Sequence, residues 1–289
     1  MRNLVIGCGY LGQRVATAWR SRGDDVHALT RSDDRARAFA QLGYSPIIGD
    51  VLQPETLKAL PTADTVLYAV GFDRTAAATK RAVYVDGLNN VLNELAGRCG
   101  KLIYISSTSV YGQDSGEFVD ESSPAEPNEE NGRICLDAET LVREFAASTR
   151  PSSTIILRLA GIYGPARLIA RAEQLRSGQQ LSGNPQAWLN LIHVEDGVQA
   201  VLAAGACRLS EATYLVCDDR PLHRADFYSA VAERVGAPVP SFYPLADNSA
   251  EKSRFNKRCV NRRLRDELLV NLRYPTISEG LASLPELSR

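Results

Sequence analysis

Residues 4–12 read LVIGCGYLG, and this stretch decides the fold because a short apolar strand runs directly into a glycine turn. The spacing of Gly7, Gly9 and Gly12 fits the pattern G-x-G-x-x-G, and apolar residues continue at helical intervals over residues 11–21. Gly7 permits a tight turn, Gly9 lets the backbone approach a diphosphate, and Gly12 allows close packing of helix against strand. We therefore predict a dinucleotide site at the amino end of this helix, where amide groups and the helix dipole favour anions.

Strand-like and helix-like segments alternate through the first 165 residues. The strand-like runs are short, apolar and bounded by turn residues, and the helical segments carry apolar residues at three- and four-residue intervals. We expect strands at residues 4–6, 26–30, 46–48, 66–70, 102–106 and 155–159. We expect helices at residues 11–21, 34–42, 76–98 and 134–147. Because parallel strands need a crossover connection, this alternation predicts an α/β fold with a doubly wound, Rossmann-type parallel sheet.

The rest of the chain has a less regular pattern, which predicts a smaller carboxyl-terminal lobe interleaved with the sheet. We expect helices near residues 168–176, 196–204 and 225–235 and a strand near residues 214–217. The expected division is a dinucleotide-binding domain at residues 1–165 and a smaller substrate lobe at residues 166–289. Residues 190–218 of this lobe are expected to pack back on the first domain.

An acidic segment separates two of the expected elements. Asp114 to Glu130 contains seven acidic residues, no basic residue and two prolines, which predicts an irregular, exposed segment. A solvated connection and a lid over the ligand both fit this composition, since long loops often carry function.

Charge and cysteine content argue against several classes of protein. The 289 residues include 33 Lys and Arg against 34 Asp and Glu, so no positive field attracts nucleic acid. No export signal is visible and no apolar run approaches the roughly 20 residues that cross a bilayer, so we expect a cytoplasmic protein without membrane contact. The six cysteines and three histidines are scattered, which predicts buried, reduced thiols and no bound metal.

The end of the second expected strand bears on the choice of dinucleotide. An NAD site usually has an acidic residue here, about 20 residues after the glycine turn, to bind the ribose 2′-hydroxyl. Thr30, Arg31 and Ser32 stand there instead, and a guanidinium with two hydroxyls suits a 2′-phosphate. NADP is therefore the preferred cofactor, and NAD stays an alternative because Asp33 and Asp34 follow.

Further cofactor contacts are expected where other strands end. Asp50 and Val51 follow the third strand, and Asp50 either approaches the adenine or caps the turn before Pro54. The complete set of expected cofactor-binding residues is Gly7, Gly9, Tyr10, Leu11, Gly12, Thr30, Arg31, Ser32, Asp50, Val51, Ala69, Val70 and Gly71.

Three later stretches join the glycine turn in a family resemblance. Residues 105–112 read ISSTSVYG, residues 157–165 read LRLAGIYGP, and residues 192–196 read IHVED. Over nearly its whole length the sequence resembles the extended short-chain dehydrogenase/reductases, the NAD-dependent epimerase/dehydratase family. The resemblance implies a nicotinamide cofactor and a small polar or sugar-like substrate, and it puts Ser107 in the place of the family's catalytic Ser/Thr.

The Tyr-x-x-x-Lys motif of that family has no counterpart in this sequence. In the family the tyrosine exchanges a proton with the substrate and the lysine lowers the tyrosine pKa. The resemblance aligns Asn131 with the tyrosine and Cys135 with the lysine. Residues 112–162 contain no tyrosine and residues 102–251 no lysine, so no shift of the alignment restores the pair. Because an amide is not a proton acid near neutral pH, we expect an atypical family member.

Other side chains are candidates for the missing acid. Tyr111 lies four residues after Ser107 and either projects toward the same cavity or packs as a buried aromatic ring with a polar tip. Tyr163 and His193 either approach from the second lobe or have structural roles. We name Ser107 and Tyr111 as candidate catalytic residues, with Ser107 hydrogen-bonding a substrate carbonyl.

Two functions stay open at this point. One is an NAD(P)-dependent oxidoreductase or isomerase with non-standard acid and base residues, favoured by the glycine turn and Ser107. The other is a catalytically silent NAD(P)-binding redox sensor or regulatory protein, favoured by the missing tyrosine and lysine. The resemblance also implies a homodimer that packs through the helices around residues 83–95 and 134–145.

Overall fold

The chain forms two compact units, each assembled from separate stretches of sequence. A computed structural model describes residues 1–73, 75–149, 151, 153–244 and 256–287. Unit 1 comprises Met1–Val110, Asn128–Arg158 and Ala200–Tyr214, and unit 2 comprises Tyr111–Pro127, Leu159–Gln199 and Leu215–Arg289. Each unit contains three separate stretches of the chain. The division into functional domains at residue 165 stays a prediction.

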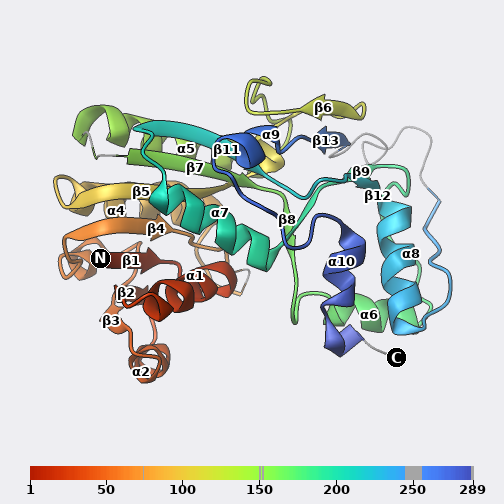
Figure 1. Ribbon diagram of the computed structural model, residues 1–289, viewed down its shortest axis with the longest axis horizontal. Helices are drawn as coiled ribbons and strands as arrows, with labels where there is room; N and C mark the ends of the chain where they lie inside the picture. Colours follow the sequence, from red (N-terminus) through yellow and green to blue (C-terminus); the bar gives the residue numbers. More distant parts are fainter. Residues whose placement is uncertain (74, 150, 152, 245–255, 288–289) are drawn as a thin grey trace. The chain divides into compact units, whose positions relative to one another are not determined.

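A seven-stranded sheet with the order β11-β7-β5-β4-β1-β2-β3 is the largest element of the fold (Figure 1). The pairs β3–β2, β2–β1, β1–β4 and β4–β5 are parallel. The strands are β1 (Arg2–Ile6), β2 (Asp25–Thr30), β3 (Ser45–Ile48), β4 (Ala63–Tyr68), β5 (Cys99–Ser107), β7 (Ser153–Leu159) and β11 (Glu211–Val216). The predicted doubly wound α/β sheet is confirmed. Strand order reverses between β1 and β4, the place where such sheets bind ligands.

Helices cover both faces of this sheet. They are α1 (Tyr10–Ser21), α2 (Asp33–Gln41), α3 (Pro54–Leu57), α4 (Gly87–Leu95), α5 (Glu130–Thr149) and α7 (Val194–Ala206). Alternate strand residues face opposite sides, so Leu102 and Tyr104 of β5 join a buried cluster with α3, α4 and α5. Ile103, between them, faces Gly205 of α7 on the other side. Both faces of the strand are therefore buried, as its continuous apolar sequence predicts.

Two segments differ from the sequence prediction. The helix expected at residues 76–98 is a π-helical turn, η1 (Ala82–Asp86), followed by α4, which ends at Leu95. The acidic segment is not wholly irregular or exposed, because β6 (Glu117–Val119) pairs in parallel with β13 (Lys257–Cys259) and Val119 is buried. The partner strand lies about 140 residues further along the chain, so no local sequence pattern predicts this pairing.

Unit 2 consists of short strands and helices around its own apolar cluster, which includes Leu175, Phe227, Val231 and Leu281. Besides β6 and β13, its elements are β8 (Gly161–Tyr163), α6 (Ile169–Arg176), β9 (Trp188–Leu189), β10 (Leu191–His193), β12 (Leu222–His223), α8 (Arg224–Val235), α9 (Arg262–Asp266) and α10 (Ile277–Ala282). The helices expected near residues 168–176 and 225–235 are confirmed as α6 and α8.

Within the described part of the chain, no helix combines the length and apolar character needed to cross a bilayer. The same described residues contain no group of three or more His, Cys, Asp or Glu side chains arranged to hold a metal ion. All six cysteines are free thiols, and Cys99 and Cys207 are less buried than the other four.

Candidate functional site

The turn between β1 and α1 requires glycine at two positions. Gly7 has a φ of 90°, a left-handed conformation, and a Cβ there would lie 2.3 Å from the carbonyl carbon of Ala69. A Cβ on Gly12 would lie 2.4 Å from the carbonyl oxygen of Gly7. The chain after β4 thus packs directly on the glycine turn, which places Ala69 and Val70 beside the expected diphosphate site.

Gly9 leaves open space at the start of α1. A Cβ on Gly9 would meet nothing within 4 Å. No described side chain caps α1, no acidic residue lies in its first turn, and Leu11 of that turn is buried. The amide groups and the helix dipole therefore present a positive end. This arrangement fits a dinucleotide diphosphate, which such helix starts bind through backbone amides.

The hydroxyls after β2 stabilise local structure. The Thr30 hydroxyl accepts a hydrogen bond from the Ser32 amide at 3.2 Å, and Ser32 caps α2 by accepting from the Arg35 amide at 3.4 Å. Arg31 is exposed and lies 3.7 Å from the Asp73 carboxylate in a surface ion pair. Since such a pair is weakly held, the Arg31 guanidinium is available to a ligand phosphate.

Arg35 is a functional candidate that the sequence argument missed. Its guanidinium donates a hydrogen bond to the carbonyl of Cys8 in the glycine turn, at 2.5 Å, and lies 5.3 Å from the centre of the Phe39 ring. The sequence signal that could have identified Arg35 is its position four residues after Arg31. Burial raises the pKa of Cys8 to about 12, although the charge of Arg35 opposes the rise, so the thiol stays protonated.

The residues after β3 have clear local roles. The Asp50 carboxylate accepts a hydrogen bond from the Leu52 amide at 2.9 Å, which is the turn-capping alternative. The Val51 carbonyl accepts from the Asn90 side chain at 3.0 Å, and a Cβ on Gly87 would lie 2.7 Å from the Val51 side chain. This turn therefore packs against the beginning of α4. Contact between Asp50 and an adenine ring stays a prediction.

The two candidate catalytic residues differ in exposure. Ser107 ends β5 and is partly exposed, and its hydroxyl accepts a hydrogen bond from the Ser109 amide at 3.1 Å. Tyr111 is buried, and its carbonyl accepts a hydrogen bond from Lys257 at 2.9 Å. Burial of the Tyr111 ring favours the packing role, whereas Ser107 stays a candidate for contact with a substrate.

The residues aligned with the missing motif lie in the first turns of α5. Asn131 is exposed, and Cys135 is buried with its sulfur 3.7 Å from the Ser109 hydroxyl. Burial raises the pKa of the Cys135 thiol against the opposing effect of this hydrogen bond. A protonated thiol carries no charge, so Cys135 does not reproduce the electrostatic effect of a lysine.

A buried ion pair fixes α5 to the sheet. Glu139 of α5 is fully buried and accepts two hydrogen bonds from Arg158 of β7, at 2.9 and 2.7 Å, and one from Ser106 at 2.6 Å. Arg143 adds another at 2.8 Å. Burial alone would raise the pKa of Glu139, but these hydrogen bonds and the arginine charges outweigh it and hold that pKa below its usual value. The network holds β5, whose last residue is Ser107, against α5.

Tyr163 and His193 lie together in unit 2 as buried structural residues. Their ring centres are 5.2 Å apart, and His193 also lies 4.0 Å from the ring centre of Tyr274. A Cβ on Gly280 would lie 1.8 Å from the Tyr163 hydroxyl oxygen, so α10 packs tightly over this ring. Burial raises the pKa of Tyr163 far above its usual value, which makes it a poor acid.

Asp218 is a buried carboxyl group in the same unit. Its Oδ1 accepts a hydrogen bond from the Arg220 amide at 3.3 Å, and its Oδ2 has no hydrogen-bond partner among the described residues. Burial is the main cause that raises the pKa of Asp218 to about 8, and the nearby carboxylates Asp219, Asp196 and Glu279 add to it. Asp218 is therefore protonated in the folded protein at neutral pH.

Replacing Asp218 with Asn should make stability less sensitive to pH. Because the folded pKa of about 8 exceeds the unfolded value, the contribution of Asp218 to the free energy of unfolding should fall as pH rises from about 4 to about 8. This group contributes at most about 1.4 kcal/mol per pH unit. Urea unfolding at several pH values should show that Asp218→Asn flattens this decline and that the exposed control Asp266→Asn does not. Equal slopes in all three proteins would contradict the assignment.

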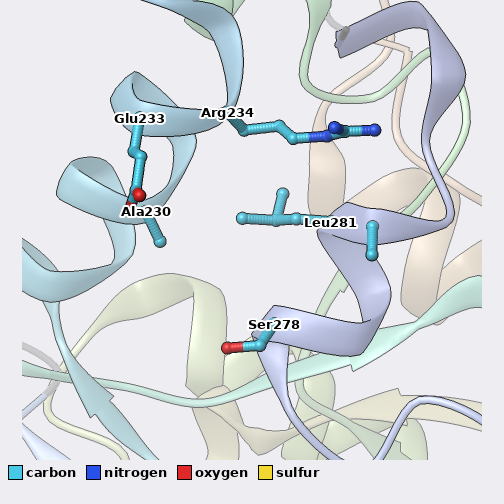
Figure 2. Close-up of a pocket in the computed structure, with 6 residues that line it drawn as sticks. Ala230, Glu233, Arg234, Ser278 and Leu281 are labelled. Atoms are coloured by element: carbon cyan, nitrogen blue, oxygen red, sulfur yellow. The ribbon is translucent and has the colours of Figure 1, made fainter.

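Unit 2 also has an open hollow of about 560 Å³ between α8 and α10 (Figure 2). Its lining residues are Ala230, Glu233, Arg234, Ser278, Leu281 and Ala282. Figure 2 shows the Arg234 side chain extending from α8 toward α10. The lining includes none of the predicted site residues, so the hollow gives no independent support for a substrate site.

Comparison with known proteins agrees with this geometry. Residues 3–216 match the NAD dependent epimerase/dehydratase family. The chain is 26% identical over 277 residues to Protein YeeZ of Escherichia coli (strain K12), covering 94% of this chain and 95% of that protein. It is 26% identical over 246 residues to 4-hydroxy-2-methyl-3-oxo-4-farnesyl-3,4-dihydroquinoline-1-oxide ketoreductase of Stigmatella aurantiaca, covering 82% and 74%.

A solved structure from Methylobacillus flagellatus, described as a candidate NAD-dependent epimerase/dehydratase, is also similar. It is 31% identical with a TM-score of 0.77, and the match covers 98% of this chain and 96% of that one. The family match covers most of the chain and includes the glycine turn and the strands of the parallel sheet. The chain therefore belongs to the NAD-dependent epimerase/dehydratase family and is a nicotinamide-dinucleotide-binding protein of that type.

Proposed function

We propose that this protein is an NADP-dependent oxidoreductase or epimerase that acts on a carbonyl or alcohol group of a small polar or sugar-like substrate. The observation that carries the proposal is the glycine turn, whose open Gly9 and uncapped helix start fit a diphosphate. When bound, the nicotinamide ring supplies or accepts a hydride. The Stigmatella aurantiaca relative is named as a ketoreductase, which supports carbonyl chemistry.

The protein's own residues have separate tasks in this proposal. The start of α1 binds the diphosphate, Arg31 and Arg35 bind the 2′-phosphate, and the backbone of Ala69 and Val70 forms the cofactor wall beside the diphosphate. The Ser107 hydroxyl hydrogen-bonds the substrate oxygen and orients it. We also propose a homodimer through α4 and α5 and a cytoplasmic location, which size-exclusion chromatography and cell fractionation check.

The preference for NADP is tested by replacing Arg31 with Met. A guanidinium hydrogen-bonded to a phosphate contributes about 1.5–3 kcal/mol, so the NADP⁺ dissociation constant should rise at least about tenfold. The NAD⁺ constant should stay within about twofold because NAD⁺ has no 2′-phosphate. Titration calorimetry gives both constants. Arg37→Met, on the exposed side of α2, is the matched control and should change neither. Equal weakening of both nucleotides by Arg31→Met would contradict the 2′-phosphate role.

The catalytic part of the proposal needs a turnover measurement. Purified protein with NADPH should consume the cofactor when offered carbonyl probes such as phenanthrenequinone, followed by loss of NADPH fluorescence. A catalytically silent sensor would leave bound NADPH unoxidised by every carbonyl tried, while its affinity for a protein partner would change with the cofactor. That second result would contradict the proposed activity.

A further inference from the structure

A lysine and a tyrosine lie one turn apart on the helical segment that precedes α4. Lys80 begins this segment, and Tyr84 lies within the π-helical turn η1. Single π-helical turns occur frequently at functional sites. Residues four apart share one face of a helix, and the Lys80 ammonium lies 5.1 Å from the centre of the Tyr84 ring. The two side chains therefore form a pair.

This pair faces the first turns of α5. The Lys80 ammonium donates a hydrogen bond to the Asn131 side-chain oxygen at 3.0 Å. Burial raises the pKa of the Cys135 thiol, and the charge of Lys80 is among the influences that lower it. Burial raises the pKa of Tyr84, and Cys135 adds to the rise. Lys80 and Tyr84 thus lie beside Asn131 and Cys135, the two positions aligned with the family's tyrosine and lysine.

The Tyr84 hydroxyl lies beside the expected cofactor wall. Tyr84 is partly buried, and the backbone of Phe72 is an influence that lowers the pKa of its hydroxyl, which puts the hydroxyl close to that backbone. Phe72 follows Ala69, Val70 and Gly71, the stretch that packs on Gly7 of the glycine turn. The hydroxyl therefore lies near the carboxyl end of β4, the edge at which doubly wound sheets bind ligands.

Several titratable groups surround this hydroxyl. They are Lys80 on its own helical segment, Cys135 on α5, Tyr68 on β4 and Tyr104 on β5. Three of these four are neutral acids whose pKa burial raises, and Lys80 is the cation among the four. A positive charge near a phenol favours the phenolate, because it stabilises the charged form of an acid.

We propose that Tyr84 donates the proton in this protein's carbonyl reduction and that Lys80 is its positioning residue. The proposal rests on the oxidoreductase function proposed above. A bound reduced nicotinamide would supply a hydride that forms the new C–H bond at the carbonyl carbon, while the Tyr84 O–H bond breaks and its proton moves to the carbonyl oxygen. The substrate leaves as an alcohol, and the Tyr84 phenolate takes a proton from water. Alcohol oxidation runs through the same steps in reverse.

The first test needs neither substrate nor cofactor. In protein labelled with ¹³C at the tyrosine ζ carbons, the Tyr84 signal is assigned by its loss in Tyr84→Phe and then titrated with pH. Lys80→Met should raise the Tyr84 pKa by about one pH unit or more, because it removes the stabilising charge. The exposed control Lys58→Met should leave it unchanged. An unchanged Tyr84 pKa in Lys80→Met would overturn the role of Lys80.

The second test measures turnover with phenanthrenequinone and NADPH. Tyr84→Phe removes one hydroxyl group and should lower kcat by about a hundred- to ten-thousand-fold. The NADPH dissociation constant should stay within about twofold, which also shows that the variant folds. Lys80→Met should move the alkaline fall of kcat to higher pH. The control Tyr243→Phe lies on an exposed ring of unit 2 and should be fully active.

The outcomes separate this inference from the function on which it rests. An active wild type with an equally active Tyr84→Phe overturns the role of Tyr84 and leaves the proposed function standing. A wild-type protein that binds NADPH but reduces no carbonyl contradicts the proposed function, and the proton-donor role with it. The NMR titration still decides whether Lys80 tunes Tyr84.

Discussion

Glu139→Gln is expected to lower the free energy of unfolding by about 3–5 kcal/mol, because it leaves the Arg158 guanidinium buried without a counter-charge. Arg158 is almost fully buried and donates two of its hydrogen bonds to the Glu139 carboxylate. Glutamine has nearly the same volume, so packing changes little and the loss is electrostatic. Chemical denaturation at neutral pH measures the difference directly.

Two further variants make this result specific. Asp137 lies on α5, two residues before Glu139, and forms an exposed ion pair with Arg81, so Asp137→Asn should cost at most about 1 kcal/mol. The double variant Glu139→Met with Arg158→Met removes both charges and should be more stable than either single Met variant. A loss for Glu139→Gln no larger than that for Asp137→Asn would show that the buried pair does not hold α5 to the sheet.

Gly9→Val is expected to weaken NADP⁺ and NAD⁺ binding by a factor of about a hundred or more. The added side chain would occupy the open space at the start of α1, where we propose that the diphosphate binds. Loss of two charge-assisted hydrogen bonds from helix amides corresponds to about 3 kcal/mol, which is that factor in affinity. Since a Cβ at Gly9 meets no atom within 4 Å, the fold should survive the substitution.

Titration calorimetry and thermal unfolding together check this prediction. The Gly9→Val protein should unfold cooperatively while binding neither nucleotide detectably. Gly205→Ala is the matched control, because a Cβ there makes only an ordinary contact 3.9 Å from Ile103. It should bind both nucleotides as the wild type does. Unimpaired binding by Gly9→Val would mean that the diphosphate lies elsewhere.

Local chemistry made much of the fold predictable from sequence. The pattern at Gly7, Gly9 and Gly12 specifies a strand, a turn and a helix within a dozen residues, and these are β1, the glycine turn and α1. Alternating apolar runs likewise placed the strands of the main sheet within a few residues of their observed limits. Such signals work because each depends on neighbours in the chain.

Features that depend on contacts distant in sequence were missed. β6 pairs with β13 across about 140 residues, and Lys80 meets Asn131 across 51. The sequence prediction considered only the positions aligned with the family motif, Asn131 and Cys135. Lys80 and Tyr84, which lie beside those positions in the fold, come from a helical segment about 50 residues earlier. Arg35 was overlooked because its contact with the Cys8 carbonyl exists only after α2 packs beside the glycine turn.

A crystal structure of the protein grown with NADP⁺ is the most direct test of the central claim. We expect the diphosphate against the amides that begin α1 at Gly9, the 2′-phosphate beside Arg31, and the Tyr84 hydroxyl facing the nicotinamide ring. Density for the dinucleotide at another site, with Gly9 facing only solvent, would contradict the account.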